Sequence, residues 1–249
     1  MVMSKSKKKI DLSIVIPSYN EFKNLGSLFN KIKLISKKNK KIEIILVNNG
    51  STDGTKTYLK SKKNLPSNIK IVNIKRNIGY GHGIISGLSK TSGKIVSWCH
   101  ADLQFDLNDV VKAFKKYYLF LNSKKSIVKG KRQNRSFLDI FFTKGMAIFV
   151  NLVFKVKVDD INAQPKIFPR SLIKKLIKYA PKDFLLDLFF LLLISKKDYK
   201  IYEFPVNVKN RFKEQAKGGG SISGKIKLTI NTLKYILFLN QNKSNLIWK

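Results

Sequence analysis

The first hundred residues alternate short apolar runs with amphipathic stretches, and this alternation restricts the fold more than any other feature. Residues 12–17 (LSIVIP) form a continuous apolar run of the length of a buried strand. Residues 21–36 then place apolar side chains at helical spacing. Strand-like runs recur at 42–47, 69–74 and 94–99, with helical segments between them. This βαβαβ order predicts an α/β fold in which a parallel sheet carries helices on both faces and binds ligands at the carboxyl ends of its strands.

The pattern loosens after residue 107, but it still contains enough apolar segments to extend the same domain. We expect helices over 109–120, 137–154, 171–179, 184–195 and 225–239, strands over 126–130 and 201–208, and an irregular segment over 159–170. Residues 217–224 (KGGGSISG) are the one clearly flexible stretch. Because the sequence contains no internal repeat, a single domain is the expected organisation.

The chain is strongly basic, with 50 Lys and Arg residues against 15 Asp and Glu residues and a net charge of +35. Only five of the 50 are Arg, whereas proteins that read nucleic acids rely on the bidentate Arg side chain. Runs of Lys between apolar segments are typical of a solvated face, and they also attract anionic lipid. We therefore expect no nucleic-acid partner, and we expect an anionic membrane surface as a further partner.

Cysteine and histidine are too scarce for several kinds of site. The single Cys99 excludes a disulfide framework and any zinc site built from several cysteines, and His82 and His100 are the only histidines. No stretch reaches the roughly 20 apolar residues that a spanning helix needs. We therefore expect a cytoplasmic protein in a reducing compartment, peripheral on the cytoplasmic face of a membrane.

Polar motifs stand at the ends of the predicted strands. In the first half they are SIVIPSYNE (13–21), ILVNNGSTDGT (45–55), RNIGYGHGIISG (76–87) and HADLQ (100–104). Further along come GKR (130–132), DINAQPKIFPR (160–170) and YEFPVNVKNR (202–211). In this order they resemble the inverting family 2 glycosyltransferases of GT-A fold, and most of all the branch of dolichyl-phosphate mannose synthase and polyprenyl-phosphate sugar transferases.

The resemblance covers roughly residues 10–215 and implies a Rossmann-like, mostly parallel sheet with amphipathic helices at the C-terminal end. It also implies an inverting transfer of a sugar from a UDP- or GDP-sugar donor to a polyprenyl phosphate, in cell-wall or glycan biosynthesis. We expect one glycosyltransferase domain over 1–249, with a nucleotide-binding half (10–107), an acceptor half (108–215) and a tail (216–249) that holds the Gly-rich segment and the last helix.

The HADLQ motif is the expected place for a divalent cation, Mn²⁺ or Mg²⁺, because the departing diphosphate needs positive charge to stabilise it. The resemblance carries the metal-ligand role to Asp102 and Gln104, and makes Asp102 a nucleotide-binding and catalytic residue. His100 stands where the family usually has Asp. Its imidazole can still ligate Mn²⁺, or it can partner a phosphate or Asp102.

Other residues are expected to hold the nucleotide. The resemblance implies that Pro17 and Tyr19 line the base and that Glu21 lies near the ribose, although Asn20-Glu21 is also an adequate helix cap. Asn49 stands where the family usually has an Asp that accepts a hydrogen bond from the base. An amide both accepts and donates, so the identity of the base stays open.

Residues 77–87 contain several glycines, and the resemblance assigns Gly79 to nucleotide binding. The spacing alone is only a weak dinucleotide signal. In the family these glycines let the backbone approach the nucleotide and the neighbouring strand. For Gly83 and Gly87, plain helix packing is an equal alternative.

The five arginines are an independent clue, because a random basic position in this chain would be Lys. Arg binds phosphate oxygens bidentately, whereas Lys acts as a point charge. Arg132 and Arg211 fit the positions that face the acceptor phosphate in the resembled branch, and Lys217 is placed beside them. Ordinary salt bridging is the alternative role for the arginines.

Two other functions stay open. A transferase of the same fold with a hydroxyl acceptor on a glycan or lipid would need a general base, for which Asp187 is the candidate. A non-catalytic basic module that binds membrane or nucleic acid would explain why His100, Asn48 and Asn49 replace acids. The sequence also leaves the oligomeric state open, with a homo-oligomer among the alternatives.

Overall fold

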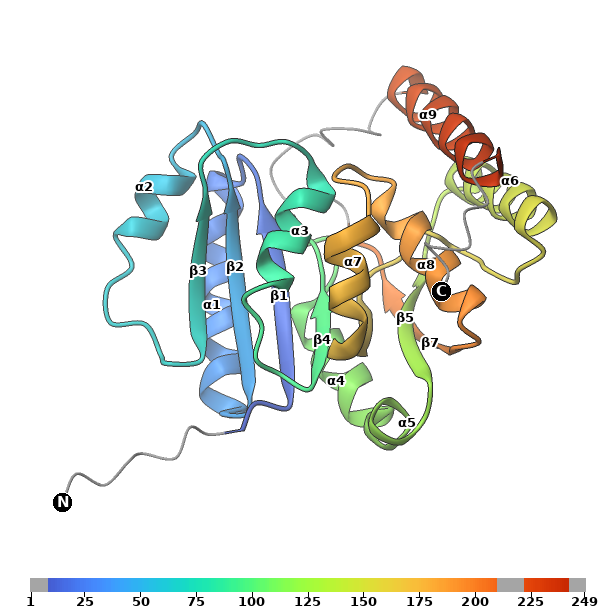
Figure 1. The fold of residues 1–249 in the computed structure, drawn as a ribbon. Coiled ribbons are helices and arrows are strands. Elements are labelled where there is room, and N and C mark those ends of the chain that lie inside the picture. Colours follow the sequence, from blue (N-terminus) through green and yellow to red (C-terminus); the bar gives the residue numbers. More distant parts are fainter. Residues whose placement is uncertain (1–8, 210–221, 242–249) are drawn as a thin grey trace.

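A computed structural model describes residues 9–209 and 222–241 and contains a seven-stranded sheet flanked by helices (Figure 1). The strand order is β3-β2-β1-β4-β6-β5-β7. The strands are β1 (Leu12–Ser18), β2 (Ile42–Asn49), β3 (Ile69–Ile74), β4 (Ile95–Trp98), β5 (Ser126–Gln133), β6 (Lys166–Pro169) and β7 (Lys200–Asn207). The helices are α1 (Phe22–Lys38), α2 (Thr55–Lys60), α3 (Tyr80–Leu88), α4 (Leu107–Lys116), α5 (Tyr118–Ser123), α6 (Phe137–Phe154), α7 (Ile173–Tyr179), α8 (Leu186–Lys196) and α9 (Ile222–Gln241), with a 3-10 turn η1 (Arg170–Leu172).

The first half of the sheet is parallel, as the apolar runs predict. β1 pairs in parallel with β2 and β4, and β2 pairs in parallel with β3. All eight residues of β2 are buried, because helices cover both of its faces. The carboxyl ends of these strands meet at the upper edge of the molecule in Figure 1, so the loops that carry the polar motifs gather there.

The second half differs from the expectation. The irregular segment predicted over 159–170 contains β6, which runs antiparallel to both β4 and β5. β6 has only four residues. Its first residue, Lys166, is fully buried and follows Pro165, and its last residue is Pro169. The prediction was wrong because a run of four residues that opens with Lys and ends with Pro does not indicate a strand. The single helix predicted over 109–120 is also wrong, since α4 ends at Lys116 and α5 begins at Tyr118.

Two apolar cores lie on the two faces of the sheet. The core on one face is formed mainly by α3, α7 and α8 with the inward side chains of the strands, and α6 and α9 also contribute to it. The core on the other face is formed mainly by α1, α4 and α5. Every residue from Leu186 to Ile194 in α8 is buried, which makes α8 the central helix of the first core.

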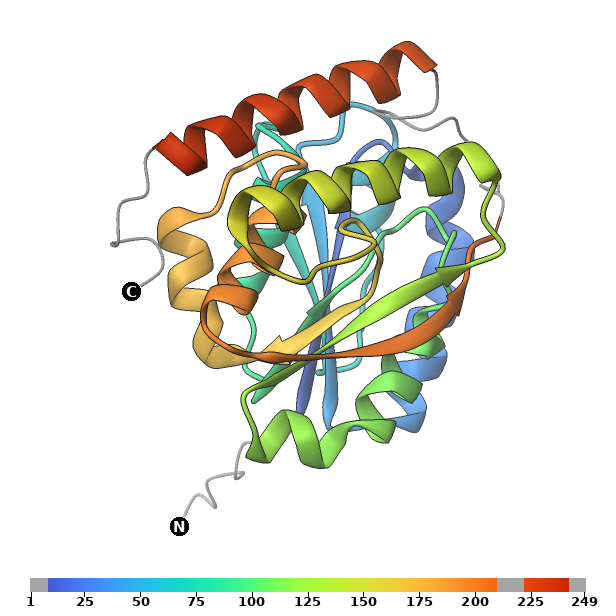
Figure 2. The same cartoon turned by 90° about the vertical axis from the view of Figure 1, so that its right-hand side faces the viewer.

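Helices α6 and α9 lie side by side at one end of the molecule, beyond the acceptor half of the sheet (Figure 2). The bounds of α6 match the predicted helix, and its first turn is capped by Ser136, whose Oγ accepts a hydrogen bond from Asp139 N at 3.2 Å. Within the described residues, α6 is the one helix that is long and apolar enough to cross a membrane, with a mean hydropathy of 1.7.

Gly87 on α3 is a sensitive packing position. A Cβ atom on this residue would lie 2.3 Å from Val15 Cγ1 and 2.7 Å from Val47 Cγ2. We expect Gly87→Ala to lower the free energy of unfolding by about 1–3 kcal/mol through overpacking, measured by urea denaturation. Gly145→Ala in α6 is the control, because nothing lies within 4 Å of its Cβ position. It should raise stability by about 0.5–1 kcal/mol, and equal effects of the two changes would contradict this account.

Candidate active site

The loops after β1 and β2 are tied together at the carboxyl edge of the sheet. Asn20 Oδ1 accepts a hydrogen bond from Thr52 N at 2.8 Å, and Asn20 N donates to Ser51 Oγ at 3.0 Å. Asp53 accepts from Phe22 N at 3.1 Å and from Thr55 N at 2.9 Å. Asp53 therefore supports the first turn of α1 from another loop, whereas the sequence indicated a cap at Asn20-Glu21.

The residues expected to face the nucleotide base and ribose lie on this edge. Pro17, near the end of β1, and Tyr19, in the loop that follows, are partly exposed. Glu21 is nearly buried, and its Oε2 accepts a hydrogen bond from Asn24 Nδ2 at 2.6 Å. The fold thus brings the three residues into one short segment at the end of β1.

Asn49 is buried at the end of β2 and is fixed by the loop before α3. Its Nδ2 donates to Gly79 O at 3.0 Å and approaches Asn77 Oδ1 at 3.4 Å. Its Oδ1 is buried without a hydrogen-bond partner in the protein. A Cβ on Gly83 would lie 2.9 Å from Asn49 Cγ. Gly83 therefore makes room for Asn49, and the amide keeps an acceptor that a donor group of a ligand can use.

Gly79 and Gly81 allow a close approach of backbone to backbone. Gly79 has φ 135°, and its Cβ would lie 2.2 Å from Lys182 O; a Cβ on Gly81 would lie 2.5 Å from Pro181 O. His82 N also donates to Lys182 O at 2.8 Å. The partner of these glycines in the structure is therefore the segment before α8, and the nucleotide-binding role of Gly79 stays a prediction.

The HADLQ motif follows β4 in a loop that turns at Leu103, which has φ 61°. Asp102 is buried, and its Oδ1 accepts from Gln104 N at 3.1 Å. Gln104 faces Lys209. Its side-chain Nε2 donates to Lys209 O at 3.4 Å, and its backbone carbonyl accepts from Lys209 N at 2.9 Å. β4 ends at Trp98, so the strand alternation predicted for this motif does not reach residues 100–104.

His100 is held in a stack of aromatic rings. Its ring lies 5.3 Å from that of Tyr80 at an interplanar angle of 17°, and 6.3 Å from that of Phe105 at 25°. The other face of the Tyr80 ring stacks against Phe184, with the ring centroids 5.0 Å apart. The stack fixes the plane of the imidazole next to Asp102.

The donor set at this loop fits a cation that is shared with a ligand. Within residues 9–209 and 222–241, no three His, Cys, Asp or Glu side chains come together to hold a metal ion. Asp102 supplies a carboxylate, His100 an imidazole and Gln104 an amide oxygen. Mg²⁺ is commonly held by one or two carboxylates together with substrate phosphates, and Mn²⁺ also accepts imidazole, so these residues suit an ion bound between protein and diphosphate.

Asp187, the candidate base, is 3% exposed and lies in a buried ion pair. Lys166 Nζ donates to Asp187 Oδ1 at 2.5 Å, to Ile161 O at 2.9 Å and to Ala163 O at 3.1 Å. Burial lowers the pKa of Lys166, although the Asp187 carboxylate opposes this shift. Asp187 also accepts from Gln164 Nε2 at 3.0 Å, so the fold uses this carboxylate as a structural anchor.

Asp187 is also connected to the aromatic stack through Tyr80. The Tyr80 hydroxyl hydrogen-bonds Asp187, and it accepts from Gln164 Nε2 at 3.3 Å. Burial and the Asp187 charge raise the pKa of Tyr80 well above its usual value. A chain of contacts therefore runs from Lys166 through Asp187 and Tyr80 to His100.

Arg132 lies at the end of β5 against Asp160. Arg132 Nε donates to both carboxylate oxygens, at 2.9 and 3.1 Å, and Nη2 also contacts Oδ1. Burial raises the pKa of Asp160, but the hydrogen bonds and charge of Arg132 outweigh it, and the pKa is lowered. Arg135 Nη1 lies 3.5 Å from the same carboxylate. Two guanidinium groups thus lie against the Asp160 carboxylate, and Asp139 and Asp159 also act on Arg135.

Sequence reasoning named Arg132 but gave no role to Arg135, Tyr80 or Lys166. The scarcity of Arg was a usable signal for Arg135. The roles of Tyr80 and Lys166 depend on contacts with distant residues and had no local signal. Arg211 and Lys217, the other residues expected at the acceptor phosphate, lie outside the described residues.

Comparisons with known proteins agree with this geometry. Residues 13–163 match the Glycosyl transferase family 2 domain. The chain belongs to glycosyl transferase family 2. This match covers β1 to the loop before β6 and includes the edge described above, so the protein is a glycosyltransferase.

Curated relatives are similar at modest identity. The chain is 28% identical over 216 residues to a dolichyl-phosphate beta-glucosyltransferase of Dictyostelium discoideum, covering 80% of this chain and 66% of the relative. It is 26% identical over 254 residues to a dolichyl-phosphate beta-glucosyltransferase of Trichomonas vaginalis, covering 95% and 76%. A dodecaprenyl-phosphate galacturonate synthase of Rhizobium johnstonii is 25% identical over 178 residues, covering 68% and 50%. The chain thus spans from half to three quarters of these relatives.

Solved structures show the fold. The glucosyl-3-phosphoglycerate synthase of Mycobacterium tuberculosis, in complex with Mn²⁺, UDP and glucosyl-3-phosphoglycerate, superposes with a TM-score of 0.66 at 17% identity, covering 91% of this chain and 80% of that one. The same enzyme with Mn²⁺, UDP-glucose and phosphoglyceric acid gives a TM-score of 0.67 at 16% identity. The family 2 glycosyltransferase therefore has the GT-A fold, as its motifs implied.

The ion pair gives a direct test of the role of Asp187. We expect Asp187→Asn to lower the free energy of unfolding by about 3–5 kcal/mol, because it leaves the Lys166 ammonium buried without a counter-ion. The double variant Lys166→Met/Asp187→Asn should recover part of this loss, because it removes the unpaired ammonium while the Asn oxygen still accepts from Gln164 and Tyr80. Urea denaturation followed by circular dichroism measures both. A general base without a structural role would instead give a stable, inactive Asp187→Asn protein.

Proposed function

We propose that this glycosyltransferase moves a sugar from a nucleotide-sugar donor to a polyprenyl phosphate. The observation that carries the choice of acceptor is the burial of Asp187 in its ion pair with Lys166. A hydroxyl acceptor needs a base to remove its proton, whereas a phosphate acceptor is already an anion. The printed names of the dolichyl-phosphate and dodecaprenyl-phosphate relatives support the same choice.

On the donor side, the proposed roles follow the carboxyl edge of the sheet. Pro17, Tyr19 and Asn49 hold the base of a UDP- or GDP-sugar, and Glu21 lies at the ribose. The buried, unpartnered Oδ1 of Asn49 supports this role because it offers an acceptor to a ring N–H. Gly79 is proposed to border the nucleotide from the loop that holds Asn49.

The diphosphate is proposed to lie at Asp102, with His100 and Gln104 beside it. A divalent cation bound there would supply the positive charge that stabilises the leaving nucleoside diphosphate. The chain's own contribution is to orient the donor. The aromatic stack holds the imidazole in place, and the buried Asp102 carboxylate is fixed by Gln104 N.

On the acceptor side, Arg132 and Arg135 are proposed to bind the phosphate of the lipid, together with Arg211 and Lys217. Two guanidinium groups lie together at Asp160, and this pairing supports an anion site because Arg binds phosphate oxygens bidentately. Since a polyprenyl phosphate is held in a bilayer, the enzyme is proposed to work peripherally on the cytoplasmic face of a membrane, with one transferase domain over 1–249.

Asp102→Asn tests the donor site. We expect kcat to fall on the order of 100-fold or more, because the leaving diphosphate loses its charge stabilisation. The rise in melting temperature that a nucleotide-sugar with Mn²⁺ causes in the wild type by mass action should also disappear. Asp106→Asn is the control in the same loop, because Asp106 caps α4 by accepting from Asn108 N at 3.0 Å, and Asn caps equally well. Unchanged turnover in Asp102→Asn would exclude the proposed site.

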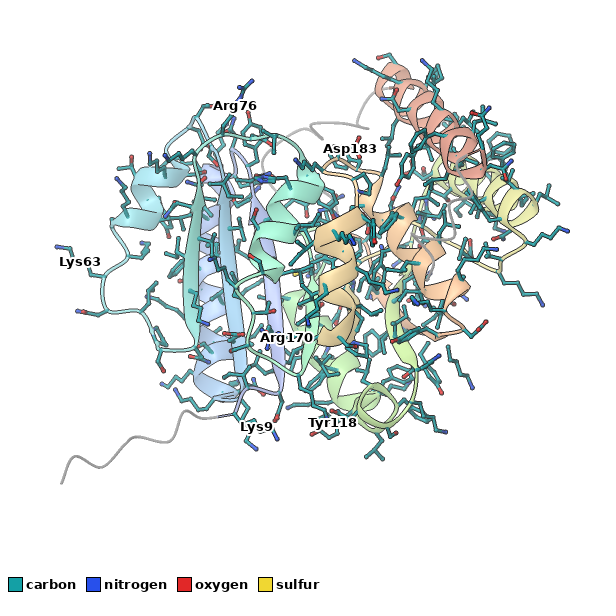
Figure 3. All side chains as sticks on the ribbon, in the orientation of Figure 1. Lys9, Lys63, Arg76, Tyr118, Arg170 and Asp183 are labelled. Carbon is teal, nitrogen blue, oxygen red and sulfur yellow. The ribbon has the colours of Figure 1, made fainter. Side chains whose placement is uncertain are left out.

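Arg132→Lys tests the acceptor site, because it keeps the charge but loses the planar fork. We expect kcat/KM for the polyprenyl phosphate to fall by about tenfold, equivalent to about 1.4 kcal/mol, while KM for the donor stays unchanged. Arg170→Lys is the control. Arg170 is exposed and lies toward the other end of the molecule, away from the carboxyl edge that Arg76 and Asp183 mark in Figure 3. If donor affinity fell as much as acceptor use, Arg132 would belong to the nucleotide site.

A further inference from the structure

The outer face of α6 is apolar and uncovered. Phe137 is 80% exposed, Phe141 is 65% exposed and Leu152 is 73% exposed. Leu138 and Ile148 are also exposed on the same helix. The spacing of 137, 141, 148 and 152 places these side chains in one stripe along the helix.

The inner face of α6 is anchored in the protein. Ala147, Val150 and Phe154 are buried in the core, and the side chain of Asn151 bonds both N and O of Val158 at 2.9 Å. A membrane-spanning arrangement of α6 would break all of these contacts. The helix is therefore held with one face on the protein and the other outward.

Helix α9 carries a second set of exposed apolar side chains beside α6. It lies next to α6 (Figures 1 and 2) and buries Ile236 and Leu239 in the same core. Its exposed apolar side chains are Ile226, Ile230, Leu237 and Phe238. We call the exposed apolar side chains of the two helices the α6–α9 surface: Phe137, Leu138, Phe141, Phe142, Ile148, Leu152, Ile226, Ile230, Leu237 and Phe238.

The charges on these helices indicate what covers the surface. Lys144 on α6 and Lys227 and Lys234 on α9 are exposed. Asp139 is the one acidic residue in the two helices, and it lies in the first turn of α6, where Ser136 Oγ donates to it. Apolar side chains flanked by Lys are the pattern of a helix that lies in the plane of an anionic bilayer interface.

We propose that the α6–α9 surface lies flat in the interface of an anionic membrane and brings the acceptor site to the lipid headgroups. The choice of lipid as occupant rests on the proposed function. Arg135 lies just before Ser136, the N-cap of α6, and its Nη2 donates to Asp139 O and Thr143 Oγ1 in the first turns of the helix. The arginines proposed to bind the acceptor phosphate are thus attached to the end of α6 that carries Phe137 and Phe141.

The test uses a single-cysteine fluorescent label on the whole chain, without substrate. Cys99 is buried, and burial and the Asp102 charge raise its pKa to about 12, so it reacts poorly with thiol reagents. An environment-sensitive fluorophore on Phe141→Cys should shift to the blue with vesicles of phosphatidylcholine and phosphatidylglycerol. It should shift much less with phosphatidylcholine alone or at high salt. Leu119→Cys on α5 is the control, since Leu119 is 74% exposed at another end of the molecule.

Vesicle flotation of unlabelled variants gives a second readout. Phe137→Ser/Phe141→Ser should reduce the vesicle-bound fraction by about tenfold, because two large apolar side chains leave the interface. Leu119→Ser/Ile177→Ser, which removes two other exposed apolar side chains, should leave it unchanged. No blue shift with anionic vesicles, or equal effects of the two double variants, would overturn the proposal. A blue shift without vesicles that grows with protein concentration would assign the surface to a second copy and overturn it as well.

A short-chain, water-soluble polyprenyl phosphate separates this inference from the proposed function. Phe137→Ser/Phe141→Ser should keep activity on that acceptor. If the wild type transfers sugar to the soluble acceptor but does not bind vesicles, the membrane-surface proposal is wrong and the proposed reaction stands. If the wild type binds anionic vesicles but transfers no sugar to this acceptor, the membrane-surface proposal stands and the proposed reaction is wrong.

Discussion

The buried ion pair between Lys166 and Asp187 organises the acceptor half and the edge of the donor half. Lys166 begins β6, which joins β4 of the parallel half to β5 of the other half. Its three donors bind Asp187 on α8 and two carbonyl groups of the 161–163 segment. A buried ammonium is tolerated only when each of its donors has a partner. The pair therefore fixes a strand, a helix and a loop relative to one another.

Both candidate binding sites depend on that arrangement. Toward the donor, Asp187 holds the Tyr80 hydroxyl, and Tyr80 stacks on His100 next to Asp102. Toward the acceptor, the 161–163 segment follows Asp160 directly, and Asp160 orients Arg132 and Arg135. A carboxylate committed to this role is a poor general base, which is why the chemistry suits an acceptor that is already ionised.

The sequence predicts the parallel half well, because its strands are buried on both faces and read as continuous apolar runs. β3 has the predicted bounds, and so does α6. β6 could not be predicted, because its burial is set by neighbours on both sides and by the distant Asp187. Two partners of the glycine-rich segment were also hidden from the sequence. Lys182 and Pro181, which Gly79 and Gly81 approach, lie about a hundred residues away.

The sequence predicts where the residues of the candidate site lie better than it predicts which residues they contact. The motifs place Asp102, Asn49 and Glu21 at one edge, since parallel strands end together. The contacts depend on loop geometry, as Gln104 shows by turning to Lys209 after the left-handed Leu103. Arg132 was predicted from the scarcity of Arg and from its position in the resembled branch, but its pairing with Asp160 required the fold.

The most direct measurement of the central claim is transfer of a labelled sugar from a nucleotide-sugar to a polyprenyl phosphate, with the product extracted into organic solvent. The account predicts an organic-soluble glycosyl phosphate, formed in the presence of a divalent cation and with the anomeric configuration of the donor inverted. Label that stays in the aqueous phase with every nucleotide-sugar, or that reaches only a hydroxyl acceptor, would contradict it.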